Sequence, residues 1–299
     1  MRLALISDIH GNLPALESVL RAIKPHSPDG ILSLGDQVNL GPCPREVLAL
    51  LRAENVTCLH GNHERYILSV QQDDPGYTGA NFNLLRFQRD LLTPEEITFP
   101  KAMEISGSIF CHAMPDDDRF PVFHVKHCTQ RLREMTFDKP THIFCGHGHD
   151  PMHYRMGNLT LDVIGSVGCM DAGVPGTAPY AILDIENDFT ALQPYYAAYD
   201  TRVIPELFRR SGMAQACPIM THITCLQMMN NRDYLLDFVG RANALAKAKG
   251  EPHVSEETWA QIDRTFAWPD GVGTKAFWET VYEAVCRTPR QTSLYVLQM

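Results

Sequence analysis

The 299-residue sequence has no long hydrophobic run, no Cys-x-x-Cys pair and no excess of basic residues. A membrane-spanning helix needs about 20 consecutive apolar residues and a secretory signal needs roughly 7–15, and the apolar run near the start of this sequence is shorter than either. The nine cysteines are scattered and odd in number, without the spacing of a thiolate metal site. We therefore expect a reduced, cytoplasmic protein with no membrane partner.

Basic residues are fewer than acidic ones. The chain has 26 Lys and Arg against 35 Asp and Glu, a formal net charge of −9, and the acidic excess lies in the first 200 residues. A broad nucleic-acid-binding surface needs a strongly basic face, so none is expected. An acidic domain that binds an anionic substrate needs a local source of positive charge, and bound metal ions can supply it.

Short apolar runs alternate with helical patterns in the first part of the chain. Strands are predicted at 3–6, 31–34 and 56–59, separated by helices at 13–23 and 44–53. This order is typical of an α/β fold with a largely parallel sheet, in which the loops after the strands form the functional edge. Further strands are expected at 109–111 and 143–145, hairpin-like strands at 152–165 and 180–197, and a helix near 81–92.

The pattern changes after about residue 200. All three tryptophans lie there, and apolar residues recur at helical spacing, as in the stretch 234–246. We therefore divide the chain into an α/β domain over residues 1–200 and a helical C-terminal region over residues 201–299. The sequence leaves open whether that region is a lid, a surface for homo-oligomerisation or a binding site for another partner.

Five short motifs follow predicted strands and supply Asp, Asn or His. Carboxylates and imidazoles gathered at one sheet edge would be costly without a cation, because unpaired ionisable groups resist burial. Seven ligands exceed the needs of one ion, so we predict two ions that share Asp36. Oxygen and imidazole donors together suit Mn, Fe, Zn, Co or Ni. The predicted metal ligands are Asp8, His10, Asp36, Asn62, His112, His147 and His149.

The same motifs resemble those of the calcineurin-like metallophosphoesterase superfamily. The series is Asp8-x-His10, Gly35-Asp36, Gly61-Asn62-His63-Glu64, His112 and Gly146-His147-x-His149. Within the superfamily, the compact bacterial phosphodiesterase branch is most similar, because it shares Asp-Ile-His-Gly-Asn at 8–12, the run at 41–48 and a Gly-Ser-Val-Gly turn at 165–168. The resemblance covers roughly residues 1–198 and not the helical region.

The resemblance implies a four-layer α-β-β-α sandwich with a dinuclear centre. One ion would be held by Asp8, His10, Asp36 and His149, and the other by Asp36, Asn62, His112 and His147. A hydroxide that bridges the ions would attack the phosphorus of a small phosphate ester. His63 would be the catalytic residue that stabilises the transition state or protonates the leaving group.

Differences from the family bear on the substrate. Protein phosphatases place an arginine before the Gly-Asn-His-Glu motif and another after Gly-Asp, whereas this chain has His60 and Asn39 in those neighbourhoods. Other members of the compact branch carry Cys at the position of His63. A histidine there is a competent acid, so its presence favours cleavage of diesters. We therefore expect a phosphodiesterase or nucleotide hydrolase. The alternatives are a phosphomonoesterase, a dinucleoside-polyphosphate hydrolase, a protein phosphatase and an inactive scaffold.

Several polar residues near the motifs are assigned structural roles. Asn12 is expected to cap the helix at 13–23, and Glu64 to begin a helix. The acidic run Asp116–Asp118 is expected to be a solvated loop, with shaping of the site entrance as the alternative.

Overall fold

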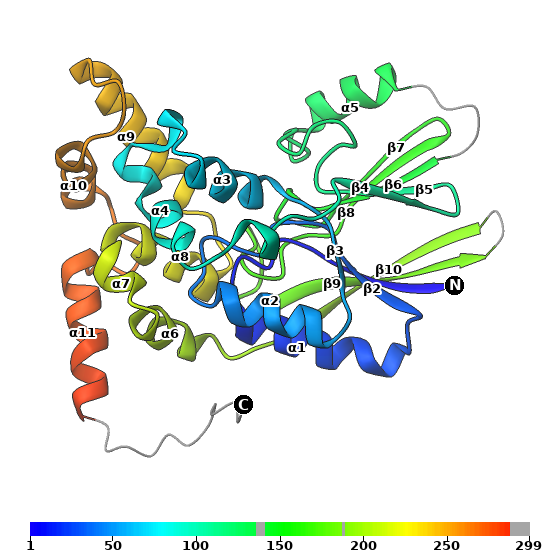
Figure 1. Cartoon of the computed structure of the whole chain (residues 1–299), viewed down its shortest axis with the longest axis horizontal. Coiled ribbons are helices and arrows are strands. Elements are labelled where there is room, and N and C mark those ends of the chain that lie inside the picture. Colours follow the sequence, from blue (N-terminus) through cyan, green and yellow to red (C-terminus); the bar gives the residue numbers. More distant parts are fainter. Residues whose placement is uncertain (136–140, 187–188, 288–299) are drawn as a thin grey trace.

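The computed structural model describes residues 1–135, 141–186 and 189–287, which form two facing β-sheets and a group of C-terminal helices (Figure 1). The strands are β1 (Arg2–Ile6), β2 (Gly30–Ser33), β3 (Thr57–Cys58), β4 (Ala102–Ile105), β5 (Ser108–Cys111), β6 (Thr141–Cys145), β7 (Met152–Met156), β8 (Leu159–Val163), β9 (Thr177–Glu186) and β10 (Phe189–Ala198). The helices are α1 (Leu13–Ile23), α2 (Pro44–Ala53), α3 (Asn62–Gln71), α4 (Asn83–Arg89), α5 (Val125–Glu134), α6 (Ile204–Arg210), α7 (Met213–Ala216), α8 (Pro218–Asn230), α9 (Leu235–Lys249), α10 (Glu256–Thr265) and α11 (Thr274–Arg287).

Both sheets combine parallel and antiparallel strands. The first sheet has the order β10-β9-β1-β2-β3, in which β1, β2 and β3 are parallel and β9 is antiparallel to both of its neighbours, β1 and β10. The second has the order β4-β5-β6-β8-β7, with β5, β6 and β8 parallel. The parallel order predicted for the first three strands is confirmed, and so are the hairpins expected at 152–165 and 180–197.

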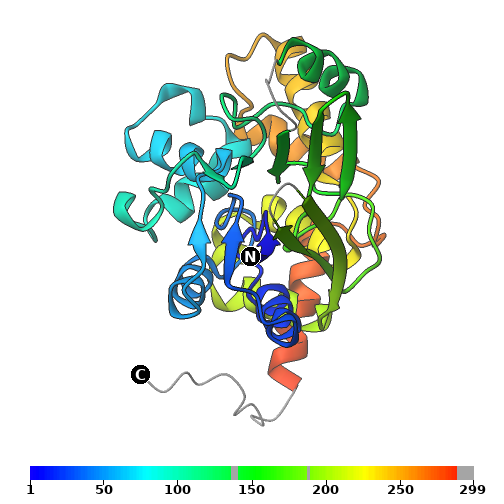
Figure 2. The same cartoon turned by 90° about the vertical axis from the view of Figure 1, so that its right-hand side faces the viewer.

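Hydrophobic side chains hold the sheets and helices in four layers. Leu16 and Val19 recur at helical spacing and therefore lie on one face of α1. Both are fully buried against the outer face of the first sheet. Leu5, Phe110 and Phe144 fill the space between the two sheets, and α5 covers the outer face of the second sheet (Figure 2). The predicted α-β-β-α sandwich is confirmed.

Two predicted elements are shorter than expected. The strand predicted at 56–59 is regular only over Thr57–Cys58; the Leu59 N–H still bonds the Ser33 carbonyl of β2 at 2.8 Å, and the next N–H, that of His60, bonds the Pro100 carbonyl instead. The helix predicted near 81–92 is regular only over Asn83–Arg89. The Ala80 N–H bonds the Val254 carbonyl at 2.7 Å, a contact with the C-terminal region that local periodicity cannot predict.

The C-terminal helices lie on the side of the molecule to which the carboxyl ends of β1 and β2 point (Figure 1). One hydrophobic cluster joins Met220, Phe238 and Trp259 of these helices to Leu40 and Cys169 of the α/β part. The helical region therefore packs directly against loops that follow the strands, while the division at residue 200 stays a prediction. No helix within the described ranges is long and apolar enough to cross a membrane.

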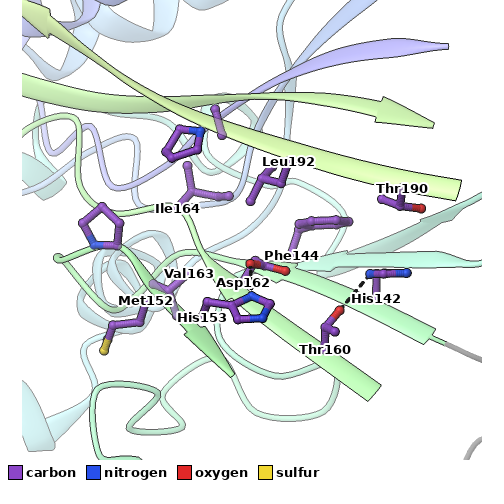
Figure 3. Close-up of a pocket in the computed structure, with 13 residues that line it drawn as sticks. His142, Phe144, Met152, His153, Thr160, Asp162, Val163, Ile164, Thr190 and Leu192 are labelled. Atoms are coloured by element: carbon purple, nitrogen blue, oxygen red, sulfur yellow. Dashed lines mark hydrogen bonds and ion pairs between the residues drawn. The ribbon is translucent and has the colours of Figure 1, made fainter. Parts of the chain in front are cut away.

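A cavity of about 430 Å³ lies between the two sheets, on strands β6 to β10 (Figure 3). Phe144 and Leu192 line it, together with a polar pair in which His153 Nδ1 and Asp162 Oδ1 are 2.6 Å apart. Its lining includes none of the seven predicted metal ligands. The candidate site is instead at the carboxyl ends of the strands.

Candidate metal centre

The predicted ligands follow five strands and meet at one edge of the sandwich. Asp8, His10, Asp36 and His147 all have φ between 49° and 61°, the left-handed region that costs a non-glycine residue roughly 1–3 kcal/mol. Such strain indicates that the loops are held in place to aim these side chains. A Cβ on Gly61 would lie 2.1 Å from Asp36 Oδ1, so only glycine allows the Asp36 carboxylate to approach there.

One group of predicted ligands surrounds His10. Its Nε2 lies 3.8 Å from Asp8 Oδ1, 3.9 Å from Asp36 Oδ2 and 3.3 Å from His149 Nε2. His149 Nε2 is also 3.8 Å from Asp8 Oδ1. These four side chains are the ones that the family resemblance assigns to the first ion, and their donor atoms are close enough to share one cation.

A second group surrounds His112. Its Nε2 lies 3.2 Å from Asp36 Oδ2 and 2.9 Å from Asn62 Oδ1. One donor atom each of Asp36, His112 and His147 lies within 4.8 Å of the others. These side chains are the set predicted for the second ion. The Asp36 carboxylate faces both groups, as a bridging ligand must.

Hydrogen bonds on the far side of three imidazoles leave their Nε2 atoms facing the centre. His10 Nδ1 lies 3.3 Å from the Val38 carbonyl, and His112 Nδ1 lies 2.9 Å from the Leu34 carbonyl. His149 Nδ1 lies 3.0 Å from Asp171 Oδ1. Partners of this kind fix the orientation and tautomer of metal-binding histidines, so each Nε2 is available as a ligand.

The electrostatics of the cluster fit cations. Asp8 is fully buried, and its Oδ1 has no hydrogen-bond partner among the described residues. Burial raises the pKa of Asp8 to about 6. Burial alone would lower the pKa of His112, but the Asp36 carboxylate raises it to about 10. A buried carboxylate oxygen aimed at two imidazoles is costly unless a cation neutralises it, so the residues present fit the divalent ions that the resemblance implies.

His63, the predicted catalytic residue, lies beside this cluster on α3. Its Nε2 is 3.9 Å from Asp36 Oδ2, and its ring contacts that of His10 at a centroid distance of 4.7 Å. Asn39 Nδ2 donates to His63 Nδ1 at 2.6 Å, which leaves the ring proton on Nε2, the atom that faces the centre. Burial lowers the pKa of His63 to about 4. One donor atom each of His10, Asp36 and His63 also lies within 4.8 Å of the others, so the geometry allows His63 to be either a ligand or a hydrogen-bond donor.

Glu64 begins α3, as predicted, and also holds the loop that carries Asp36. Its buried carboxylate accepts hydrogen bonds from the backbone N–H groups of Asp36, Gln37 and Gly61 at 2.8–3.0 Å. Burial raises the pKa of Glu64 to about 8. The residue therefore acts as a brace between two of the loops that form the site.

Replacing Glu64 with Gln is expected to destabilise the fold by about 1–3 kcal/mol, because the new amide N–H group leaves a buried backbone N–H without an acceptor. The Asp36 loop should loosen, and metal affinity should fall with it. Thermal unfolding and Mn²⁺ titration measure the two effects. Glu96→Gln is a matched control, since Glu96 accepts from the Thr93 N–H at a partly exposed helix start, and equal losses in both variants would contradict the bracing role.

The structure adds two residues that the sequence did not indicate. Cys169 is buried, and its Sγ lies within 4.8 Å of one nitrogen of His10 and one of His149. Asp171 accepts the His149 hydrogen bond described above. Both follow the Gly-Ser-Val-Gly turn at 165–168, which is the only sequence signal near them. Neither belongs to a recognisable motif, so their proximity to the site depends on the fold.

The acidic run Asp116–Asp118 is a loop in which Asp116 and Asp117 are exposed, as predicted. Asp118 forms an ion pair with Arg65, with Oδ2 and Nε 2.8 Å apart, and Asp116 pairs with Arg131. The run lines a cavity of about 340 Å³ whose wall includes His112. The alternative expectation, that these residues shape the entrance to the site, stays a prediction.

Asn12 has the structural role that was predicted. Its Oδ1 accepts a hydrogen bond from the Ala15 N–H at 3.2 Å, and its Nδ2 donates to the Gly168 carbonyl at 2.7 Å. It caps α1 and ties β1 to the turn that precedes Cys169. His60 is buried, and its Nδ1 has no hydrogen-bond partner among the described residues.

Comparison with known proteins gives consistent results. The family model described as calcineurin-like phosphoesterase matches residues 1–168. An uncharacterized protein of Methanocaldococcus jannaschii, MJ0912, is 31% identical over 210 residues, which cover 62% of this chain and 84% of that protein. A metallophosphoesterase from Sphaerobacter thermophilus has a TM-score of 0.57 at 22% identity and covers 77% of this chain and 100% of its own. The protein PH1004 of Pyrococcus horikoshii has a TM-score of 0.59 at 16% identity, covering 78% and 99%.

Proposed function

The chain belongs to the calcineurin-like phosphoesterase family and is a metal-dependent phosphoester hydrolase, and on this premise we propose that it cleaves phosphodiesters or nucleotide-type phosphate esters at a centre of two divalent ions. The ions are proposed to be transition metals (Mn, Fe, Zn, Co or Ni), held by the seven predicted ligands. The observation that carries the proposal is the position of Asp36. Its Oδ2 lies 3.2 Å from His112 Nε2 and 3.9 Å from His10 Nε2, so one carboxylate is shared by two groups of ligands.

The chain's own residues have separable tasks in this reaction. When bound, a pair of divalent ions supplies an activated water and neutralises the phosphoryl oxygens. The loops after the strands keep the ligands oriented before substrate binds, which lowers the cost of reaching the transition state. His63 is the proposed hydrogen-bond donor to the leaving oxygen in the transition state, since Asn39 occupies its Nδ1 and keeps the proton on Nε2.

The cavity beside His112 supports a substrate with a second anionic group. Two of its acidic residues are neutralised by the Arg65–Asp118 and Arg131–Asp116 pairs. Lys101 and Arg119, which also line it, form no ion pair within the described part of the chain, and they outnumber Asp117, a lining carboxylate that forms none there either. The side chains of this cavity can therefore attract phosphate or carboxylate groups next to the metal centre.

Aromatic rings beside His63 support a nucleotide in particular. The ring of Tyr66 lies 5.3 Å from that of His63, and Tyr77 lies 5.7 Å from Tyr66, measured between ring centroids. Both tyrosines are partly exposed. A nucleobase stacks well on such faces. The unpaired cations also suit the phosphate chain of a dinucleoside polyphosphate, which is our second candidate substrate.

Changing Lys101 and Arg119 together to Ala is expected to raise KM for a nucleotide diester about tenfold, with kcat changed less than threefold. Two attractions of about 0.7 kcal/mol each, typical of partly exposed charges, would account for that factor. Steady-state kinetics at low and high salt measure it. Lys247, an exposed lysine of α9, provides the control variant Lys247→Ala. An unchanged KM in the double variant would show that this cavity does not bind substrate.

A substrate panel tests the proposed function. The Mn²⁺-loaded protein should cleave aryl phosphodiesters and nucleotide diesters faster than aryl monoesters, and it should leave phosphoserine peptides almost intact. Faster monoester cleavage would favour a phosphomonoesterase instead. No cleavage of any ester by protein that holds both ions would contradict the proposal and favour a scaffold.

A further inference from the structure

A hydrogen-bonded chain connects the metal centre to the C-terminal helical region. His149 Nδ1 lies 3.0 Å from Asp171 Oδ1, and Gln227 Nε2 of α8 donates to the same Asp171 oxygen at 3.2 Å. Asp171 lies in the connection between β8 and β9, beyond residue 168, where the match to the family model ends. A proposed metal ligand is therefore supported by a helix outside the matched segment.

The backbone around Asp171 is fixed by the same helical region. The Asp233 N–H bonds the Asp171 carbonyl at 3.0 Å, and the Gly173 N–H bonds the Asn231 carbonyl at 2.8 Å. Asn231 Nδ2 donates to the carbonyls of Val174 and Thr177, at 2.7 Å each. Because the residues that follow α8 bind Asp171 and the loop after it, the position of the Asp171 carboxylate depends on where the end of α8 lies.

The position of Gln227 in α8 is energetically unfavourable for an amide side chain. It is only 2% exposed and lies on a helix whose neighbouring side chains, such as Ile223 and Met228, are buried and apolar. Burying an amide costs free energy unless it is hydrogen-bonded. Its Oε1 has no partner among the described residues, so the bond from Nε2 to Asp171 is the interaction that its side chain contributes.

We propose that α8 helps to position the ligands of the metal centre. Gln227 is the positioning residue for the ion held by Asp8, His10, Asp36 and His149. Gln227 fixes Asp171, Asp171 orients the His149 imidazole, and the fixed Nε2 binds the ion more tightly than a freely rotating one. Direct hydrogen-bond partners of metal-binding histidines, as Asp171 is here, change metal affinity about 10–100-fold, and Gln227, which acts through Asp171, is expected to reach the lower end of that range. The inference rests on the proposed dinuclear centre and assigns the C-terminal region a role in metal binding instead of a role only as a lid.

The test is a Mn²⁺ titration of metal-free protein, followed by calorimetry. Gln227→Met keeps the volume and suits the apolar surroundings, so it should fold, but it removes the donor to Asp171. We expect it to weaken one of the two Mn²⁺ sites about tenfold and to leave the other unchanged. Gln227→Glu, which places a carboxylate against Asp171, should weaken the same site and serves if the Met variant does not fold.

Thr224→Val is the matched control. Thr224 is buried in the same helix, and its hydroxyl donates to the Met220 carbonyl and not to the metal-site loops. This variant should bind both ions with the affinity of the wild type. Folded Gln227 variants that also bind both ions normally would overturn the inference while the dinuclear centre stands. Wild-type protein that binds no Mn²⁺ would overturn both.

Discussion

Replacing Asp36 with Asn is expected to lower kcat/KM about a thousandfold or more and to weaken both metal sites. The Asn amide has the size of the Asp carboxylate, and its oxygen can still accept a hydrogen bond from the His63 backbone N–H, which bonds Asp36 Oδ1 at 2.8 Å. The loop should therefore keep its shape. What is lost is the negative charge that faces both groups of ligands. Metal ions supply several kcal/mol of transition-state stabilisation, and about 4 kcal/mol corresponds to a thousandfold.

The control for this variant is Asp184→Asn. Asp184 forms an exposed ion pair with Arg2, 2.8 Å apart, at the end of the first sheet where β1 begins and away from the site, so activity and metal content should stay at wild-type levels. Metal content by elemental analysis accompanies the kinetics. An Asp36→Asn protein that retains two ions and activity within tenfold of the wild type would rule out the shared-carboxylate arrangement.

Replacing His63 with Ala is expected to lower kcat about 10²–10³-fold while both ions remain bound. A preorganised hydrogen-bond donor to developing charge contributes within that range, and the seven proposed ligands are all retained. The loss should be smaller for substrates whose leaving group is a good one, such as nitrophenyl esters, because such a leaving oxygen delocalises its developing charge and gains less from the hydrogen bond. Steady-state kinetics with good and poor leaving groups, beside metal analysis, measure these effects.

His153→Ala is the matched control for a histidine, because His153 is exposed and bonds Asp162 in the cavity between the sheets. It should not change activity. Loss of one ion from the His63→Ala protein would instead make His63 a ligand, an arrangement that its distance of 3.9 Å from Asp36 Oδ2 permits.

The sequence predicted the layers and the edge where the ligands meet, because both depend on local patterns. Alternating strands and helices imply parallel strands whose carboxyl ends share one edge, and each predicted ligand follows a strand within a few residues. Asn12 as a cap was likewise predicted from neighbouring residues, and it accepts the expected backbone hydrogen bond.

What the sequence could not predict depends on contacts between distant residues. Gln227 and Asp171 are 56 positions apart, and Arg65 and Asp118 are 53 apart. No periodicity connects them, since their proximity follows from how α8 and the loop beside His112 pack in three dimensions. The left-handed backbone at Asp8 and His147 was equally hidden, because such strain is imposed by the surrounding structure and not by residue type.

Anomalous diffraction from crystals of the Mn²⁺-loaded protein tests the central claim most directly. Two peaks are predicted about 3.5–4 Å apart, one on each side of the Asp36 carboxylate, with His10 and His149 near one and His112 and His147 near the other. A single peak, or two peaks of which only one contacts Asp36, would contradict the dinuclear centre.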